Sequence, residues 1–206
     1  YDNKTSYNVH LGLHGGLAIM PKGISNQAYI GSPTFNKQLF WIFNDIDPAL
    51  HSAVQRGVAV PTSFTPRYFT INGVTSLPPG AAGDGDSLRD AFYDPRSRLV
   101  GTVGKDRILV RIINAGLCSH AVHPHANHFE WLTDRGVARP TIWKKDTLYL
   151  RNKLGKLDAI FPFEAPPDAY PPVTTGYYPM HLHDEMSQTA GGGLYQFGSS
   201  TEIVLK

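Results

Sequence analysis

Short runs of β-branched and aromatic residues, bounded by Gly, Pro, Asn or Asp, dominate the hydrophobic pattern of this 206-residue chain. Such runs predict strands, because these side chains pack well on a pleated sheet and the bounding residues favour turns. Several short strands separated by turn signals indicate a β-sandwich or a β-barrel. We expect strands at residues 38–44, 67–71, 107–113, 147–150 and 202–205.

One stretch, residues 48–56, has the periodicity of an amphipathic helix. Asp47 can cap its first turn, and Pro48 suits the first helical position, where the backbone needs no amide hydrogen. We therefore expect a single good helix in a chain that is otherwise all-β.

The distribution of Gly and Pro predicts the domain organisation. Segments 75–87 and 164–176 are rich in both residues and predict long surface loops within one domain. Residues 1–35 are Gly-rich, contain one apolar strand signal at 17–20, and cannot form a core of their own. We therefore assign residues 36–206 to the principal domain.

Composition narrows the class of partner. Hydrophobic residues make up 41 % of the chain and charged residues 17 %, with a net charge of +2 and no block of like charge. This balance excludes disorder as the main state and gives no electrostatic reason to expect nucleic acid or an anionic membrane as partner. No run of eighteen apolar residues is present, so we expect no membrane span.

The single cysteine, Cys118, excludes an intrachain disulfide and any CxxC motif. We expect it to be a small buried residue, because free cysteine behaves as a small hydrophobe.

The histidines are the clearest chemical signal. Six of the nine fall in two short segments: His120, His123, His125 and His128 in the first, His181 and His183 in the second. Alternate side chains of a strand share one face, so each H-x-H pair can point the same way. Four imidazoles without a thiolate favour copper, with zinc as the alternative.

Segments 111–130 (RIINAGLCSHAVHPHANHFE) and 178–198 (YPMHLHDEMSQTAGGGLYQFG) resemble the last cupredoxin domain of multicopper oxidases. The hallmarks of that domain are H-x-x-H-x-H and, downstream, H-C-H-x3-H-x4-M. The resemblance implies a cupredoxin-like Greek-key β-sandwich over residues 36–206 and copper as the cofactor. It also implies that residues 1–35 are the remnant of a preceding cupredoxin domain and a linker.

The resemblance implies a role for each histidine of the two pairs. His123 corresponds to a ligand of the type 2 copper. His125, His181 and His183 correspond to ligands of the type 3 pair in an oxygen-reducing trinuclear centre.

The blue, type 1 copper site departs from the family pattern. His120 corresponds to one of its ligands, but Leu182 stands in the cysteine position, Ser187 in the second histidine position and Gly192 in the methionine position. Met186 is not at the family spacing. We therefore expect no blue copper here and interpret His120 as a relic or a polar-network residue.

The histidines that the preceding domain supplies in this family have no counterpart in the chain, because His10 and His14 are in the wrong context. The chain therefore resembles a half-site that needs a partner. We expect a homo-oligomer, with a trimer favoured, or a separate chain that carries the preceding cupredoxin domain. Export to the periplasm or the extracellular space is implied by the same resemblance.

Three functions stay open. The first is a copper oxidoreductase that contributes the type 2 and type 3 half-site and couples substrate oxidation to dioxygen reduction. The second is a copper reductase of the nitrite-reducing kind, and the third is a non-catalytic structural or assembly subunit that binds one copper or none. Asp184 or Glu185 can relay protons or orient an imidazole, and His128 is a further candidate ligand.

Overall fold

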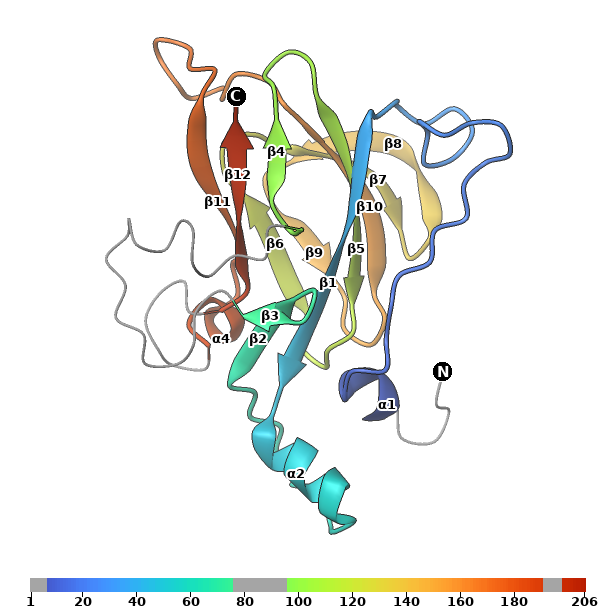
Figure 1. Ribbon diagram of the computed structural model, residues 1–206, viewed down its shortest axis with the longest axis vertical. Helices are drawn as coiled ribbons and strands as arrows, with labels where there is room; N and C mark the ends of the chain where they lie inside the picture. Colours follow the sequence, from blue (N-terminus) through green and yellow to red (C-terminus); the bar gives the residue numbers. More distant parts are fainter. Residues whose placement is uncertain (1–6, 76–95, 191–197) are drawn as a thin grey trace.

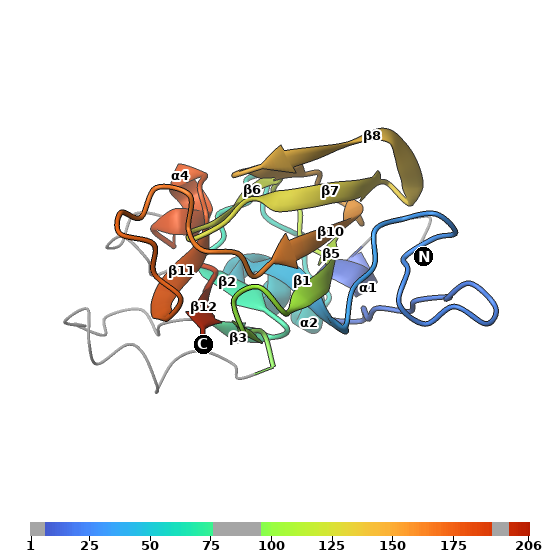
Figure 2. The ribbon, with the colours of Figure 1, turned by 90° about the horizontal axis from the view of Figure 1, so that it is seen from above.

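The computed structural model describes residues 7–75, 96–190 and 198–206. They form two packed β-sheets (Figures 1 and 2), one of seven strands in the order β3-β2-β1-β5-β10-β7-β8 and one of five in the order β4-β12-β11-β6-β9. The larger sheet contains β1 (Lys37–Ile46), β2 (Tyr68–Ile71), β3 (Val74–Thr75), β5 (Arg107–Asn114), β7 (Phe129–Asp134), β8 (Val137–Lys145) and β10 (Lys156–Pro162). The smaller sheet contains β4 (Leu99–Gly101), β6 (His120–Pro124), β9 (Leu148–Leu150), β11 (Gly176–Leu182) and β12 (Ser200–Leu205). The helices are α1 (Tyr7–His10), α2 (Pro48–Arg56) and α4 (Glu185–Gln188).

This architecture confirms the all-β sandwich, and each of the five expected strands is present, as β1, β2, β5, β9 and β12. Helix α2 has the predicted bounds because both of its ends are capped. The Asp47 carboxylate accepts the backbone N–H groups of Ala49 and Leu50, and Gly57 ends the helix in the left-handed region at φ +66°.

The core lies between the two sheets. Trp41 and Phe43 of β1 make edge-to-face ring contacts at 6.4 Å, and Trp41 meets Phe129 of β7 at 6.0 Å. The Trp41 indole N–H donates to the carbonyl of Ser97 over 2.7 Å, so this buried ring has its polar atom satisfied. Each fully buried side chain of this size contributes about 1.5–3 kcal/mol of transfer free energy.

The strand expected at residues 17–20 is wrong, because this segment carries no backbone pairing. It lies across the outer face of the larger sheet, where Gly16 meets the Phe40 ring and the Met20 sulfur lies 2.9 Å from Arg111 Nη2. The face of a sheet offers no unpaired backbone groups, so apolar side chains alone cannot make a strand there. Leu17 and Ile19 are left 87 % and 86 % exposed.

The segments around this crossing close a smaller apolar cluster. Phe35, Leu109, Leu132 and Ile160 are buried there, and partly buried residues from the N-terminal segment pack on them. The assignment of residues 1–35 to a preceding domain stays a prediction. Residues 164–175 form the expected loop, whereas most of the other expected loop, 75–87, lies outside the described residues.

None of the helices in the described part of the chain combines the length and apolar character needed to cross a lipid bilayer.

Candidate metal centre

Strands β6 and β11 bring the two histidine pairs together. The strands are antiparallel, and His123 stands directly opposite His181 in their register. His125 and His183 follow just beyond the strand ends, where their backbone N–H groups continue the pairing at 3.0 and 2.7 Å. Directly opposed and diagonal positions of such a pair place their side chains on one face. The prediction that both histidines of each H-x-H pair point to the same side is therefore confirmed.

The four rings form one cluster. The His123 ring centroid lies 4.8 Å from that of His125, 5.5 Å from that of His181 and 5.2 Å from that of His183. The Nε2 atoms of His125 and His181 are 3.2 Å apart. Two nitrogen atoms at about 2.0–2.1 Å from a common ion and at a tetrahedral angle lie about 3.3 Å apart, so this pair fits one metal ion.

Hydrogen bonds determine which ring nitrogen of His123 keeps a lone pair for a metal ion. Its Nδ1 lies 2.8 Å from the backbone oxygen of Asp146 and 3.1 Å from the Thr147 hydroxyl. A carbonyl oxygen can only accept, so Nδ1 carries the proton and Nε2 keeps its lone pair. His181 Nδ1 lies 3.3 Å from the oxygen of Leu182, which favours the same tautomer. Metal-binding imidazoles are oriented in this way.

Burial favours the neutral form of two of the rings, those of His125 and His181. Burial, opposed by the hydrogen bond to the Leu182 carbonyl and helped by the neighbouring imidazoles, lowers the pKa of His181 to about 4. Burial also lowers the pKa of His125, helped by His123 and His183. Neutral imidazole is the form that binds metal, so near neutral pH these side chains present lone pairs rather than positive charges.

One ring nitrogen from each of His123, His125 and His181 lies within 4.8 Å of the other two. His183 is exposed at the open side of the cluster. His128 lines a surface hollow of about 230 Å³ together with His123 and His125, but it does not belong to this group of three.

The inner face of the same strand pair carries no thiolate. Leu182 is fully buried in the core and stands opposite Val122, which is also fully buried. It therefore points away from the histidine cluster, as expected from the alternation of side chains along a strand. Ser187, which stands in the second histidine position, is buried, and its hydroxyl donates to the Asp184 carboxylate. Gly192 lies outside the described residues.

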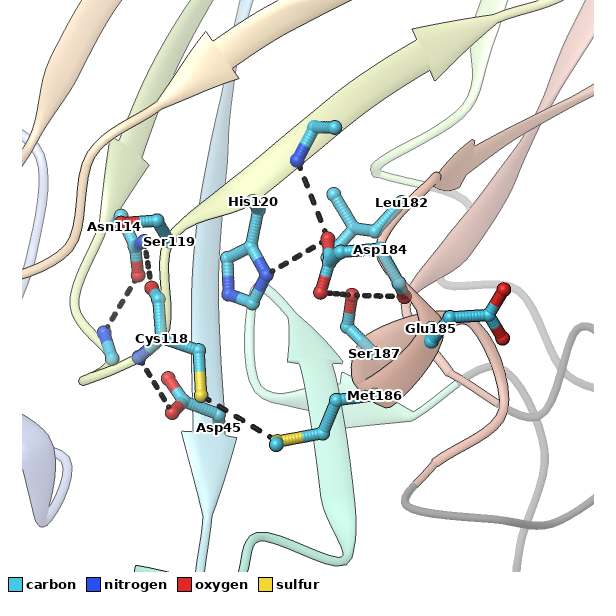
Figure 3. A network of polar contacts seen from close by, with 12 residues as sticks. Asp45, Asn114, Cys118, Ser119, His120, Leu182, Asp184, Glu185, Met186 and Ser187 are labelled. Atoms are coloured by element: carbon cyan, nitrogen blue, oxygen red, sulfur yellow. Dashed lines mark hydrogen bonds and ion pairs between the residues drawn. The ribbon is translucent and has the colours of Figure 1, made fainter.

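His120 is a buried member of a polar network (Figure 3). Its ring packs against Phe43 and Phe69 at 6.2 and 6.4 Å, and its Nδ1 lies 3.4 Å from Asp184 Oδ1. Burial opposes ionisation of Asp184, but hydrogen bonds from His120, Ser187 and the backbone outweigh it and lower the pKa of this carboxyl. Asp184 therefore orients His120, while Glu185 is exposed.

Sequence reasoning missed one contact near this network. Cys118 is half-buried rather than buried, and its thiol faces Met186 with the two sulfur atoms 3.8 Å apart. The two residues are 68 positions apart, and no spacing signal in the sequence connects them.

No model of a protein family matches the sequence, and no curated protein matches it. Among solved structures, the blue copper oxidase from Nitrosomonas europaea is similar at a TM-score of 0.58 and 20 % identity, covering 82 % of this chain and 43 % of its own. The multicopper oxidase mgLAC is similar at a TM-score of 0.59 and 19 % identity, over 82 % and 44 %. The fold is cupredoxin-like.

Copper nitrite reductase from Nitrosomonas europaea shares this cupredoxin-like fold more distantly, at a TM-score of 0.51 and 15 % identity, over 84 % of this chain and 50 % of its own. The expected fold class is thus confirmed. The chain spans half or less of the length of each of these three structures.

Proposed function

We propose that this chain contributes the type 2 and type 3 histidine half-site of a multicopper oxidase that couples substrate oxidation to dioxygen reduction. The observation that carries the proposal is the convergence of His123, His125, His181 and His183 on one face of the β6–β11 pair. An all-nitrogen donor set of neutral imidazoles suits copper. The residues therefore fit the metal that the fold suggests.

Copper bound there would supply one-electron transfer and dioxygen chemistry. The protein's own part is to hold the donors ready. The Asp146 carbonyl and the Thr147 hydroxyl fix the ring of His123, and burial keeps His181 neutral. The exposed His183 leaves one side of the cluster accessible to a further ligand or subunit.

A partner follows from this incomplete centre. The similar solved structures are at least about twice as long as the region they share with this chain. Leu13, Leu17 and Ile19 are 77 %, 87 % and 86 % exposed, which is apolar surface that a neighbouring domain would cover. We propose a homo-oligomer, with a trimer favoured, or a separate chain carrying the preceding cupredoxin domain, located in the periplasm or outside the cell.

The test is copper content and electron paramagnetic resonance of natively isolated protein, with His181→Ala/His183→Ala beside the unchanged chain. We expect the double variant to lose its copper and its type 2 signal while keeping the far-ultraviolet circular dichroism of the β-sandwich. His128→Ala is the matched control, since this histidine lines the same hollow outside the converging group, and it should keep its copper. Unchanged copper in a folded double variant would overturn the proposal.

One observation favours a second candidate, a non-catalytic cupredoxin-like subunit that binds one copper or none. Leu182 stands where the multicopper oxidase pattern has its blue-copper cysteine, and its fully buried apolar side chain supplies no thiolate at that position. The two functions differ in oxygen consumption. The oxidase half-site should consume oxygen with a reductant once its partner is present, whereas the structural subunit should not do so with any reductant.

A further inference from the structure

Two sulfur atoms meet at the end of the sandwich where β6 begins and α4 lies (Figure 3). Cys118 lies just before β6, Met186 lies in α4, and the distance from Sγ to Sδ is 3.8 Å. Two sulfur ligands about 2.3 Å from a common ion and at a tetrahedral angle lie about 3.8 Å apart. The sulfur pair therefore has the separation that one bound ion requires.

A buried imidazole adjoins the sulfur pair. His120 is 1 % exposed; its Nδ1 faces Asp184 Oδ1 at 3.4 Å, whereas its Nε2 makes no hydrogen bond within the described residues. Figure 3 shows the ring pointing from β6 toward the side where Cys118 and Met186 lie. The Asp184 carboxylate acts electrostatically on both His120 and Cys118, which places the two side chains in one environment. A buried ring nitrogen without a hydrogen bond is costly unless a ligand satisfies it, so the Nε2 atom is the donor that His120 has free for a metal ion.

Two residues of β1 contact His120 and Cys118 and so place both residues against the same strand. Phe43 and Asp45 are two residues apart on one face of this strand. The His120 ring contacts Phe43, and the Asp45 carboxylate accepts the backbone N–H of Cys118 at 3.0 Å. The His120 ring and the backbone of Cys118 therefore lie against the same face of β1.

We propose that Cys118, Met186 and His120 form a second metal site, selective for cuprous ion and separate from the histidine centre. Thiolate and thioether sulfurs are soft ligands that select Cu(I) over harder divalent ions, and an imidazole completes the set. Met186 is 45 % exposed and Cys118 is half-buried, so an ion can enter from solvent. The site does not use the Leu182 position, where the family places its blue-copper thiolate.

Binding at this site must release a proton. In the metal-free chain the Cys118 thiol donates toward the Met186 sulfur at 3.8 Å, so the side chain carries its proton. Such a thiol is a poor nucleophile. A Cu(I) ion forms a bond to sulfur as the S–H proton leaves to solvent, one proton for each ion bound and with no change in oxidation state.

The experiment is an anaerobic titration of the reduced full chain with Cu(I) against a coloured Cu(I) chelator, together with copper X-ray absorption of the loaded protein. We expect the unchanged chain to hold one more Cu(I) ion than Cys118→Ser, and Met186→Leu to weaken that ion at least about tenfold. The absorption spectrum should contain two sulfur neighbours at about 2.3 Å. Met20→Leu is the matched control, because the Met20 sulfur lies on the other sheet beside Arg111.

The outcomes separate this site from the histidine centre. His181→Ala/His183→Ala should keep the Cu(I) ion with its two sulfur neighbours, whatever happens to the copper of the histidine centre. Equal Cu(I) content in the unchanged chain and in Cys118→Ser would overturn the proposal and leave the 3.8 Å contact as a weak hydrogen bond from thiol to thioether. If Cys118→Ser fails to fold, Met186→Leu still decides the question, because its side chain is partly exposed.

Discussion

Asp106 offers a sharp test of how the sandwich is held together at one end of β1 and β5. Its carboxylate is 6 % exposed and accepts the backbone N–H of Thr102 at 2.7 Å, the ammonium of Lys37 at 3.0 Å and the amide of Asn36 at 2.8 Å. These donors come from the start of β1, from the residue before it and from the turn that precedes β5. We expect Asp106→Asn to loosen both connections, because the replacement amide cannot accept at both positions.

The size of the effect follows from the carboxyl group's pKa. The Thr102 N–H, opposed by burial and helped by Lys37 and Asn36, lowers the pKa of Asp106 from 3.8 to about 2. Since one pKa unit corresponds to about 1.4 kcal/mol, the ionised group contributes on the order of 2 kcal/mol to the free energy of unfolding. The native pKa is the lower one, so this contribution is fully present above about pH 4 and is lost as the pH falls toward 2.

Urea unfolding of Asp106→Asn and the unchanged chain, at pH 7 and in steps down to pH 2.5, measures this contribution. The variant should be less stable by about 2 kcal/mol at pH 7, and the difference should shrink below about pH 4. Asp168→Asn, in an exposed loop, controls for the loss of a carboxylate as such and should match the unchanged chain. Equal stability of Asp106→Asn at pH 7, or a difference that is constant down to pH 2.5, would refute the reasoning.

Two further substitutions test packing. Gly116→Ala would place its Cβ 1.3 Å from the buried Asp45 carboxylate. Urea unfolding should show a free energy of unfolding lower by about 3 kcal/mol or more, and a decrease below about 1 kcal/mol would contradict this contact. Trp41→Phe leaves the Ser97 carbonyl without its 2.7 Å hydrogen bond and should lower the free energy of unfolding by about 2 kcal/mol, whereas an unchanged thermal midpoint would contradict it.

The histidine centre was predictable because it depends on a local rule. Side chains two residues apart share one face of a strand, so each H-x-H pair had to point one way wherever the strand lay. The same rule placed Leu182 on the opposite face, and the structure buries it in the core. What the residues themselves could not supply is the register that sets His123 against His181, because pairing depends on the whole sheet.

The errors have the same origin. Residues 17–20 are apolar and favour a strand, but the edges of the neighbouring strands are occupied, so the segment crosses a sheet face without pairing. The Cys118 thiol faces Met186, which follows β11 in the sequence and lies 68 positions away along the chain. Composition predicts that a free cysteine packs as a small hydrophobe, but it cannot predict which side chain of a distant segment will face it.

The two candidate metal sites lie on opposite faces of β6, which supplies His120 to one site and His123 to the other. Along β6 burial alternates, with His120 and Val122 buried on the inner face and His123 on the outer face. A substitution on one face therefore leaves the donors on the other face in place. For this reason Leu182 can stand where the family has a thiolate while His181 and His183 still converge with the other pair. The same independence means that copper in the histidine centre and Cu(I) on the sulfur atoms should respond to separate variants. If Cys118→Ser removed both, the two sites would be coupled through the sheet, and the assignment of each to its own face would be wrong.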